Sequence, residues 1–526
     1  MNEYFGKKFR HNPWDDYLMA RRVEIETPIV VLLRLWRAGA PIMELNGKSR
    51  LNNNCDMKNR SMNKIYIPVL LCSALFFISG CQLQPNQMKA DLDFLFKTIE
   101  EVHPNMYAYI SDDEFGQHRK RLYGQINQPL TRAEFYKLVS PVVAELRSGH
   151  LRLWPPKGDF RATSSNVFAI GLRWDGQNAI LKENYGPENL PLGGKLLEIN
   201  GQDANSIIYK FARYTADECK NADPWIIERA DFLRFYLWLE FGDAETLDLK
   251  IRARDGKEGH CTVTAFPARK LAKRVKDNEN KWSYRHLPEY NTGLMEINLW
   301  QNTPQFNEFL NKTFETIDDN KASNLIIDIR DNPGGRSPPV QWILEYLTDK
   351  PFRTAEKIET KVSKQFLQAT GRTLEEFRRM LGDESIEFGR VIIQNIHLRK
   401  PVDKPHRFGG NIFVLIGRQT ASASVEFAST IKCFNIGVLV GEETGDATVS
   451  FGNTFSFKLN NSGLRFGVPS KLGFQACGKS DGRGVIPDYE VDQKPEDTAE
   501  GVDTVLQFTL DLIRNGGTVS DIQLAD

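Results

Sequence analysis

The first clear pattern of apolar residues along the chain is helical and runs from about residue 91 to 146. Apolar side chains recur every three or four positions in DLDFLFKTIEEV (91–102), and TRAEFYKLVSPVVAEL (131–146) repeats this spacing after a Thr typical of a helix start. In RSGHLRLWPP (147–156) apolar residues instead fall at alternate positions, which indicates a strand. We therefore expect a helical domain at about residues 90–155.

Short strand patterns bounded by glycines fill the next part of the chain, about residues 160–268. NVFAIGLRWDGQNAILKEN (166–184) and GGKLLEINGQDA (193–204) predict strands with Gly turns, and NSIIYKFARY (205–214) predicts a helix. This order is similar to a PDZ-type module, a fold that takes a peptide C-terminus as an added strand. The alternative is a small β domain of another kind, since Gly-bounded strands are common.

Buried strands alternate with helices over about residues 280–515. NLIIDIR (324–330) is a nearly continuous apolar run, as expected for a parallel strand covered on both faces, and NIFVLIGR (411–418) is similar. A helical pattern follows each run. Functional groups in such sheets collect at the carboxyl ends of strands, where DNPGG (331–335) and TASAS (420–424) fall.

One segment near the start of the chain, MNKIYIPVLLCSALFFISGCQ (62–82), has the form of an export signal. A Lys follows the Met, the apolar run is shorter than the roughly 20 residues of a membrane span, and small residues precede Cys81. The ending ISGC resembles a bacterial lipobox, which implies a signal peptide at 62–81 and a lipid on Cys81. The alternative is a transmembrane or buried core helix.

A signal of this kind stands at the N-terminus of a protein, so we expect translation to start at Met62 and residues 1–61 to be an upstream extension. The expected location is the cell envelope, with a lipid anchor on Cys81 that holds a periplasmic or surface-facing protein at the membrane. Export permits disulfides among Cys219, Cys261, Cys433 and Cys477. Three pairings are open, and in a domain this large free buried cysteines are the favoured interpretation.

The composition of the chain mainly excludes classes of partner and cofactor. The length of 526 residues predicts about three domains of roughly 150 residues, with 41 % apolar and 26 % charged residues as in globular proteins. The formal net charge is zero and no long Lys/Arg block occurs, so no nucleic-acid partner is expected. The sequence has no CxxC pair, no HExxH and no phosphate loop, so we expect neither a metal nor a cofactor.

Four stretches in fixed order carry a family resemblance: DIRDNPGG (328–335), RQTASASVE (418–426), VGEETG (440–445) and GRGVIPD (482–488). They resemble the C-terminal processing, or tail-specific, serine peptidases, including the core of tricorn protease. The resemblance covers about residues 90–510. It implies a multidomain α/β protein with an N-terminal helical domain, a PDZ-like β domain and a ClpP- and crotonase-like α/β catalytic domain.

The family's nucleophile falls on Ser422, the first serine of ASAS. It would stand at a helix N-terminus, where unpaired N–H groups and the helix dipole favour negative charge. The alternative is helix capping by Thr420, Ser422 or Ser424. A capping box would need Ser or Thr three residues before Glu426, and that residue is Ala423.

The resemblance also implies an oxyanion hole. Its donors would be the N–H of Ala423 and that of a glycine in the NPGG turn, Gly334 or, as the second choice, Gly335. Glycine lets the backbone approach closely. A tight turn that needs glycine for its dihedral angles is the alternative, and both can hold together.

The general base follows from the branch of the family. One branch uses a lysine about 25 residues after the serine, but GEETGDATVSFG (441–452) has none, and Lys458 comes later in an apparent hairpin strand. The tricorn-like branch uses a histidine from an earlier segment, which falls on His150 in RSGHLRL. Its near-neutral pKa suits proton transfer. A structural histidine is the alternative, and the serine that precedes this histidine in tricorn is Gly149 here.

The third group should orient the imidazole. By position before GVIPD it falls on Asp481, with Glu442 and Glu443 as competitors.

The resulting hypothesis is a serine endopeptidase that acts on polypeptides through an acyl-enzyme, with a PDZ-like module that presents the substrate's C-terminus. The alternatives are a non-catalytic binding or scaffold lipoprotein that keeps the fold, and a hydrolase of esters or small peptides.

Overall fold

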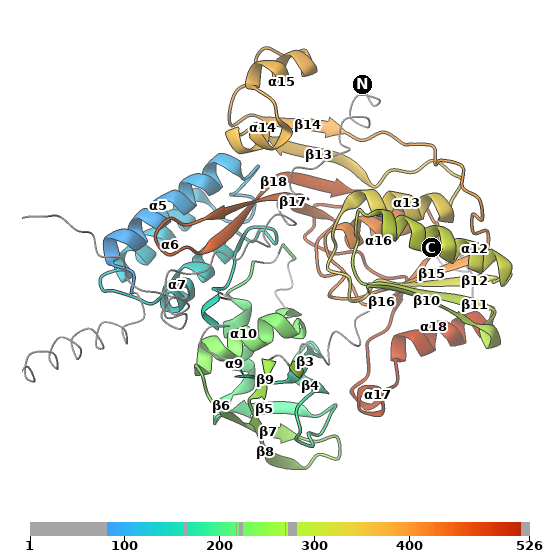
Figure 1. Ribbon diagram of the computed structural model, residues 1–526, viewed down its shortest axis with the longest axis horizontal. Coiled ribbons are helices and arrows are strands. Elements are labelled where there is room, and N and C mark those ends of the chain that lie inside the picture. Colours follow the sequence, from blue (N-terminus) through green and yellow to red (C-terminus); the bar gives the residue numbers. More distant parts are fainter. Residues whose placement is uncertain are drawn as a thin grey trace, which may run out of the picture. The chain divides into compact units, whose positions relative to one another are not determined.

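The computed structural model describes residues 82–156, 158–160, 166–216, 218–219, 225–268, 270–271 and 281–516. The expected upstream extension, the signal peptide and Cys81 lie outside these residues. The described residues belong to one compact unit and form a mixed α/β multidomain fold (Figure 1). No helix within the described ranges is long and apolar enough to cross a membrane.

A six-stranded, mostly parallel sheet forms the centre of the C-terminal half. Only β10 and β11 are antiparallel among its neighbouring pairs. In spatial order the strands are β10 (Trp282–Leu287), β11 (Thr292–Ile297), β12 (Asn324–Asp328), β15 (Asn411–Ile416), β16 (Val438–Gly441) and β19 (Tyr489–Glu490). The crossover between β15 and β16 is the helix α16 (Ala423–Cys433), so the helix predicted after the apolar run 411–418 is confirmed.

Both faces of this sheet are covered, which explains the continuous apolar run of β12. Leu325 and Ile327 point into the core formed with α12 (Pro304–Asp319), α13 (Ser337–Leu347) and α16. Ile326 points to the opposite face, which α18 (Thr504–Arg514) covers (Figure 1). Successive side chains of a strand alternate between faces, so a strand between two helical layers needs an apolar residue at every position.

A second, antiparallel sheet links the two ends of the described chain. Its order is β1 (Arg152–Leu153), β18 (Arg465–Gln475), β13 (Ala355–Lys361) and β14 (Val391–Asn395), and β17 (Val449–Lys458) also pairs with β18. Two short helices, α14 (Lys364–Thr370) and α15 (Leu374–Leu381), lie between β13 and β14 in the chain.

The N-terminal helices share a core with the β17–β18 hairpin. They are α5 (Pro85–Val102), α6 (Asp112–Gln125) and α7 (Arg132–Ala144). The ring of Phe94 packs edge-on against Phe466 at 6.0 Å between centroids, and the carboxylate of Asp91 accepts the N–H of Ser462 at 2.7 Å. The predicted Thr start is confirmed, because Thr131 and Glu134 form a capping box at α7.

The middle region contains a small antiparallel sheet with two helices. The strands are β3 (Ile170–Trp174), β4 (Ala179–Asn184), β5 (Lys195–Ile199), β6 (Gln202–Asp203), β7 (Thr246–Arg252) and β8 (Glu258–Thr264), and the helices are α9 (Ala204–Ala212) and α10 (Ala230–Phe241). The minor elements of the chain are β2 (Asn166–Val167), β9 (Phe266–Pro267), α17 (Pro495–Glu500) and the 3₁₀ turns η1 (Trp225–Glu228) and η2 (Pro288–Tyr290). The PDZ-like assignment and the domain boundaries stay predictions.

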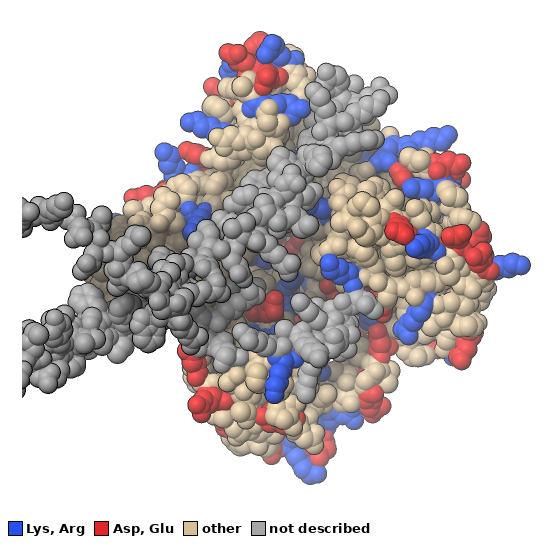
Figure 2. All heavy atoms as spheres, viewed as in Figure 1, with Lys and Arg blue, Asp and Glu red and all other residues tan. Residues whose placement is uncertain are grey.

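Charges of both signs are interspersed over the visible face of the described residues (Figure 2). Figure 2 shows no large area of a single sign there, in keeping with the formal net charge of zero.

Cys433 at the end of α16 and Cys477 just after β18 form a disulfide, with 5.7 Å between their Cα atoms. The expectation of free buried cysteines is therefore wrong for this pair. Cys219 donates its S–H to the carbonyl of Gly445 at 3.4 Å, and Cys261 is half-buried. The sequence could not show the pairing, because the two cysteines, 44 residues apart, meet only once both sheets have formed.

We expect the double variant Cys433→Ser/Cys477→Ser to lose about 4 kcal/mol of unfolding free energy, the loop-closure entropy of a cross-link with 44 residues of separation. Urea unfolding of the oxidised protein measures it. Cys261→Ser is the control and should unfold at the wild-type midpoint. Equal midpoints for wild type and the double variant would contradict the stabilising role.

Candidate active site

Ser422 has a strained backbone between β15 and α16. Its φ is 54° and its ψ is −119°, a region that residues with a side chain rarely adopt. Its N–H donates to Asp446 Oδ2 at 2.6 Å, and its carbonyl accepts the N–H groups of Val425 and Glu426. Ser422 occupies the N-cap position of α16, but its side chain makes no capping hydrogen bond. The capping alternative therefore does not account for this hydroxyl.

The hydroxyl instead meets His150. The distance from His150 Nε2 to Ser422 Oγ is 3.2 Å, across 272 residues of sequence. His150 lies just before β1, and the pairing of β1 with β18 brings this segment to the catalytic sheet. A serine hydroxyl within hydrogen-bond reach of an imidazole is the arrangement of an activated nucleophile and its base.

The surroundings keep the imidazole neutral. Burial lowers the pKa of His150 below its ordinary value, the carboxylate of Asp446 opposes this shift, and Arg152 adds to it. A neutral ring can accept the proton of Ser422 through Nε2, and the hydrogen then resides on Nδ1. Nδ1 is buried and has no hydrogen-bond partner among the described residues.

Asp446 is the site residue that the sequence reasoning missed. It holds the N–H of Ser422 and places a negative charge beside His150. It lies in GEETGDATVSFG, 24 residues after Ser422, about where the lysine-dependent branch carries its base. An acid in that stretch was the available signal, but only the fold shows that it faces the serine.

The three carboxylates expected as third group have other partners in the described structure. Asp481 accepts the N–H of Arg483 at 3.0 Å and lines a hollow of about 110 Å³ with Tyr109 and Arg147. Glu443 forms an ion pair with Arg483 at 2.6 Å.

Glu442 pairs with Arg173 at 2.8 Å and with Arg418 at 3.1 Å. None of these three carboxylates hydrogen-bonds to His150 within the described ranges. The structure thus brings Ser422 and His150 together and leaves Asp481, Glu442 and Glu443 engaged elsewhere.

The NPGG turn approaches Ser422 as the oxyanion-hole interpretation requires. A Cβ added to Gly334, whose φ is +107°, would lie 2.6 Å from the Cβ of Ser422, so only glycine fits there. The N–H of Gly334, however, donates to Asn332 Oδ1 at 2.9 Å. The N–H groups of Gly335 and Ala423 donate to no acceptor in the described part of the chain. Of the two glycines, Gly335 is therefore the one whose N–H has no described acceptor, and the choice between them as oxyanion-hole donor stays a prediction.

Asn332 joins the loops on which these groups depend. The side-chain amide of Asn332 donates to the carbonyl of Ile297 at the end of β11 at 2.9 Å. The main-chain carbonyl of Asn332 accepts the N–H of Ala421 at 3.2 Å. Together with the bond from Gly334, these contacts fix the turn after β12 against the loop before α16. The side chain is fully buried, so every one of its hydrogen bonds counts for stability.

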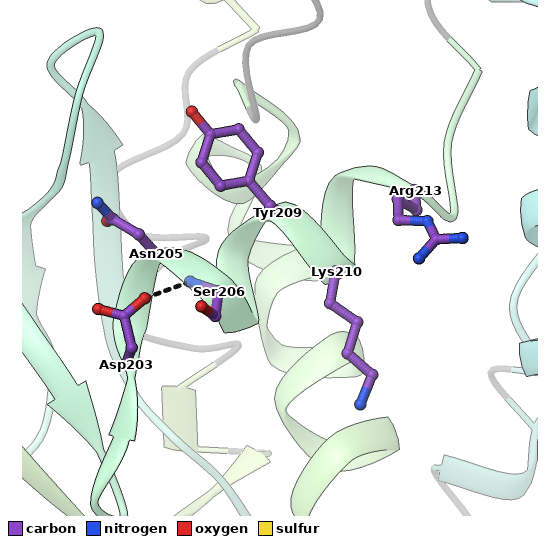
Figure 3. A pocket seen from close by; sticks show the side chains of 6 residues that line it. All are labelled: Asp203, Asn205, Ser206, Tyr209, Lys210 and Arg213. Carbon is purple, nitrogen blue, oxygen red and sulfur yellow. Dashed lines mark hydrogen bonds between the residues drawn. The ribbon is translucent and has the colours of Figure 1, made fainter.

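No cluster of His, Cys, Asp and Glu in the described ranges has an arrangement that could hold a metal ion. A hollow of about 630 Å³ lies along α9 in the middle region (Figure 3). Its lining contains none of the residues above and consists of Asp203, Asn205, Ser206, Tyr209, Lys210 and Arg213. The side chains of Lys210 and Arg213 do not converge on a common point in Figure 3.

Comparison with known proteins finds a sequence-profile match and similar folds. Residues 291–491 match the profile of the family described as "Peptidase family S41". Among solved structures the chain is similar to mature CPAF, with 17 % identity, a TM-score of 0.55, and coverage of 82 % of this chain and 99 % of that chain.

It is likewise similar to mature CPAF complexed with lactacystin, with 16 % identity, a TM-score of 0.56, and coverage of 84 % of this chain and 99 % of that chain. At this identity the likeness shows the fold. A search of curated protein sequences finds no significant match.

The protein is thus a serine-type peptidase of mixed α/β fold. The match to peptidase family S41 spans residues 291–491, which include the strands and loops that carry Ser422.

We expect Asp446→Asn to shift the pH dependence of serine reactivity. The base works when neutral, so reactivity rises as pH increases through the pKa of His150, which burial places below 6.5. The amide still accepts the N–H of Ser422 but no longer favours the imidazolium. The acid limb therefore moves to lower pH, and the plateau falls about tenfold, because a less basic imidazole removes the proton of Ser422 more slowly.

The rate of labelling by a fluorophosphonate between pH 4 and 9 measures both quantities. Glu443→Gln is the control on the same loop and should leave the acid limb in place. A shift in Asp481→Asn but none in Asp446→Asn would contradict the assignment and favour the residue that the sequence predicts.

Proposed function

We propose that the protein is an endopeptidase that hydrolyses polypeptides through an acyl-enzyme, with Ser422 as nucleophile and His150 as general base. The observation that carries this proposal is the 3.2 Å approach of Ser422 Oγ to His150 Nε2. Two further features support it: the strained backbone of the serine and the loss of any capping role for its hydroxyl.

In the proposed reaction Ser422 Oγ attacks the scissile carbonyl carbon while its proton passes to His150 Nε2. The negative oxygen of the tetrahedral intermediate accepts hydrogen bonds from the N–H of Ala423 and from the NPGG turn, where Gly335 has the uncommitted donor. The imidazolium returns its proton to the leaving amine, and water then hydrolyses the ester on Ser422. Asp446 stabilises the imidazolium by its charge, and Asp481 stays the sequence-based alternative for this role.

The middle region would present the substrate. Its antiparallel sheet and two helices support the PDZ-like interpretation, in which a peptide C-terminus adds to the sheet as a strand. An ion-pair chain from Arg173 on β3 through Glu442 to Arg418 joins this sheet to the loop before Ser422. Faster cleavage of a peptide with a free C-terminus than of its C-terminal amide is the expected result, and equal rates would exclude this mode of presentation.

We expect Ser422→Ala to abolish fluorophosphonate labelling and casein cleavage, because no other hydroxyl of the described residues hydrogen-bonds to the imidazole of His150. His150→Ala should lower the labelling rate about 10³-fold, the usual contribution of a general base. Exposed residues of the middle region give the controls, and Ser206→Ala and His260→Ala should label like wild type.

Folded wild-type protein that does not label would favour the non-catalytic binding lipoprotein. Labelling with ester hydrolysis but without cleavage of any polypeptide would favour a hydrolase of small substrates.

The location is a separate part of the proposal. The lipobox-like ISGC before residue 82 supports a lipid on Cys81 that anchors the protein in the cell envelope, periplasmic or surface-facing. We expect Cys81→Ser to prevent incorporation of a clickable fatty acid when residues 62–526 are expressed in a bacterium. Cys72→Ser, in the same apolar segment, is the control and should still be labelled. Labelling that survives Cys81→Ser would contradict the anchor.

A further inference from the structure

A second histidine–serine pair lies behind the proposed catalytic one. His103, at the C-cap of α5, is 1 % exposed, and its Nε2 lies 3.0 Å from the Oγ of Ser148, which is also fully buried. Ser148 precedes His150 by two residues. This pair therefore lies on the short segment that carries the proposed base, and neither residue hydrogen-bonds to Ser422 in the described structure.

The direction of this hydrogen bond follows from the other ring nitrogen. The N–H of Asn105 donates to His103 Nδ1 at 3.2 Å, so Nδ1 is the acceptor and the ring hydrogen is on Nε2. Burial, assisted by the charge of Lys361, lowers the pKa of His103 to about 3, so the ring stays neutral. His103 Nε2–H therefore donates to Ser148 Oγ at any pH where the protein would work.

Both the ring and the main chain of His103 are held by neighbours. The centroid of the ring lies 4.3 Å from that of Phe451 on β17. Lys361 on β13 donates to the main-chain carbonyl of His103 at 3.1 Å. The N–H of Phe451 donates to Glu218 Oε1 at 3.1 Å, and the same oxygen accepts the N–H of Gly149 at 3.0 Å. Two neighbouring residues of the loop, Ser148 and Gly149, are thus held by groups that also contact β17.

These contacts on Ser148 and Gly149 can fix the position of His150, because no described group hydrogen-bonds to Nδ1 of its imidazole. In a triad a carboxylate on that nitrogen sets the ring direction. Among the described residues, the hydrogen bonds of His150 are the one between Nε2 and Ser422 Oγ and one of 3.4 Å from the Thr454 hydroxyl to the His150 carbonyl. The direction of the ring then depends on where the main chain of residues 148–150 is held.

We propose that His103 and Ser148 are positioning residues that align the general base through its backbone. This inference rests on the proposed function, since it assumes that His150 is the base. It assigns no chemical step to His103, whose Nε2 is used by Ser148 and whose ring is sealed from solvent.

The test is Ser148→Ala, which removes one buried oxygen and the anchor of the loop. We expect the fluorophosphonate labelling rate per active site to fall roughly ten- to a hundredfold, as for a misplaced catalytic group, while the final labelling stoichiometry stays that of wild type. His103→Leu should behave like Ser148→Ala. His103→Gln keeps an N–H donor near the position of Nε2 and should restore most of the rate.

Two controls separate positioning from a general loss of structure. Ser140→Ala removes an equally buried serine hydroxyl, which bonds the carbonyl of Tyr214 and not the His150 loop, and should leave the rate unchanged. In a His150→Ala background, Ser148→Ala should have no further effect, because the two residues act through one group. A merely structural role would lower the rate in both backgrounds.

The outcomes are distinguishable from failure of the proposed function. No labelling of folded wild-type protein would overturn both proposals. Labelling that depends on Ser422 and His150 but stays within twofold of wild type in Ser148→Ala would overturn the positioning role alone. A full additional loss in the His150→Ala background would also overturn it. If His103→Leu does not fold, the positioning role is tested by Ser148→Ala alone and by Ser148→Ala in the His150→Ala background.

Discussion

The antiparallel pairing of β1 with β18 is the contact on which the arrangement of the site depends. Arg152 lies opposite Gly467 and Leu153 opposite Phe466, and the pairing begins two residues after His150. Closing a loop of 272 residues between His150 and Ser422 costs conformational entropy that a two-residue strand cannot offset. The compensation comes from burial, because α5–α7 and the β17–β18 hairpin form one apolar core around this pairing.

Ser422, the proposed nucleophile, depends on a different set of contacts, since its backbone is strained. A residue with a side chain at φ 54° persists only when the surroundings determine its conformation. Asp446 holds its N–H, Val425 and Glu426 hold its carbonyl, and Asn332 holds the preceding Ala421. Asp446 also counteracts the effect of burial on the pKa of His150, so one carboxylate serves both the geometry and the charge balance.

Helices and strands were predictable from the sequence where one local pattern of residues determines the element. The continuous apolar run of NLIIDIR predicted a doubly covered strand, and the Thr131 start of α7 predicted a capped helix. The approach of Ser422 to His150 came from the family resemblance, which supplies long-range information that periodicity lacks. Contacts that arise only when separate sheets meet were not accessible, and the Cys433–Cys477 disulfide is the clearest case.

The proposed third catalytic group is another case in which the sequence alone does not identify the contact. Position in a motif points to Asp481, whose carboxylate accepts the N–H of Arg483, whereas the charge that acts on His150 belongs to Asp446. Gly149 is informative here, since a Cβ added to it would lie 3.8 Å from both Asp446 Oδ1 and Glu218 Oε1. A serine in its place would thus face two carboxylates, of which Asp446 raises the pKa of His150. The departure at Gly149 removes a hydroxyl but leaves Asp446, so this electrostatic support of His150 does not require that serine.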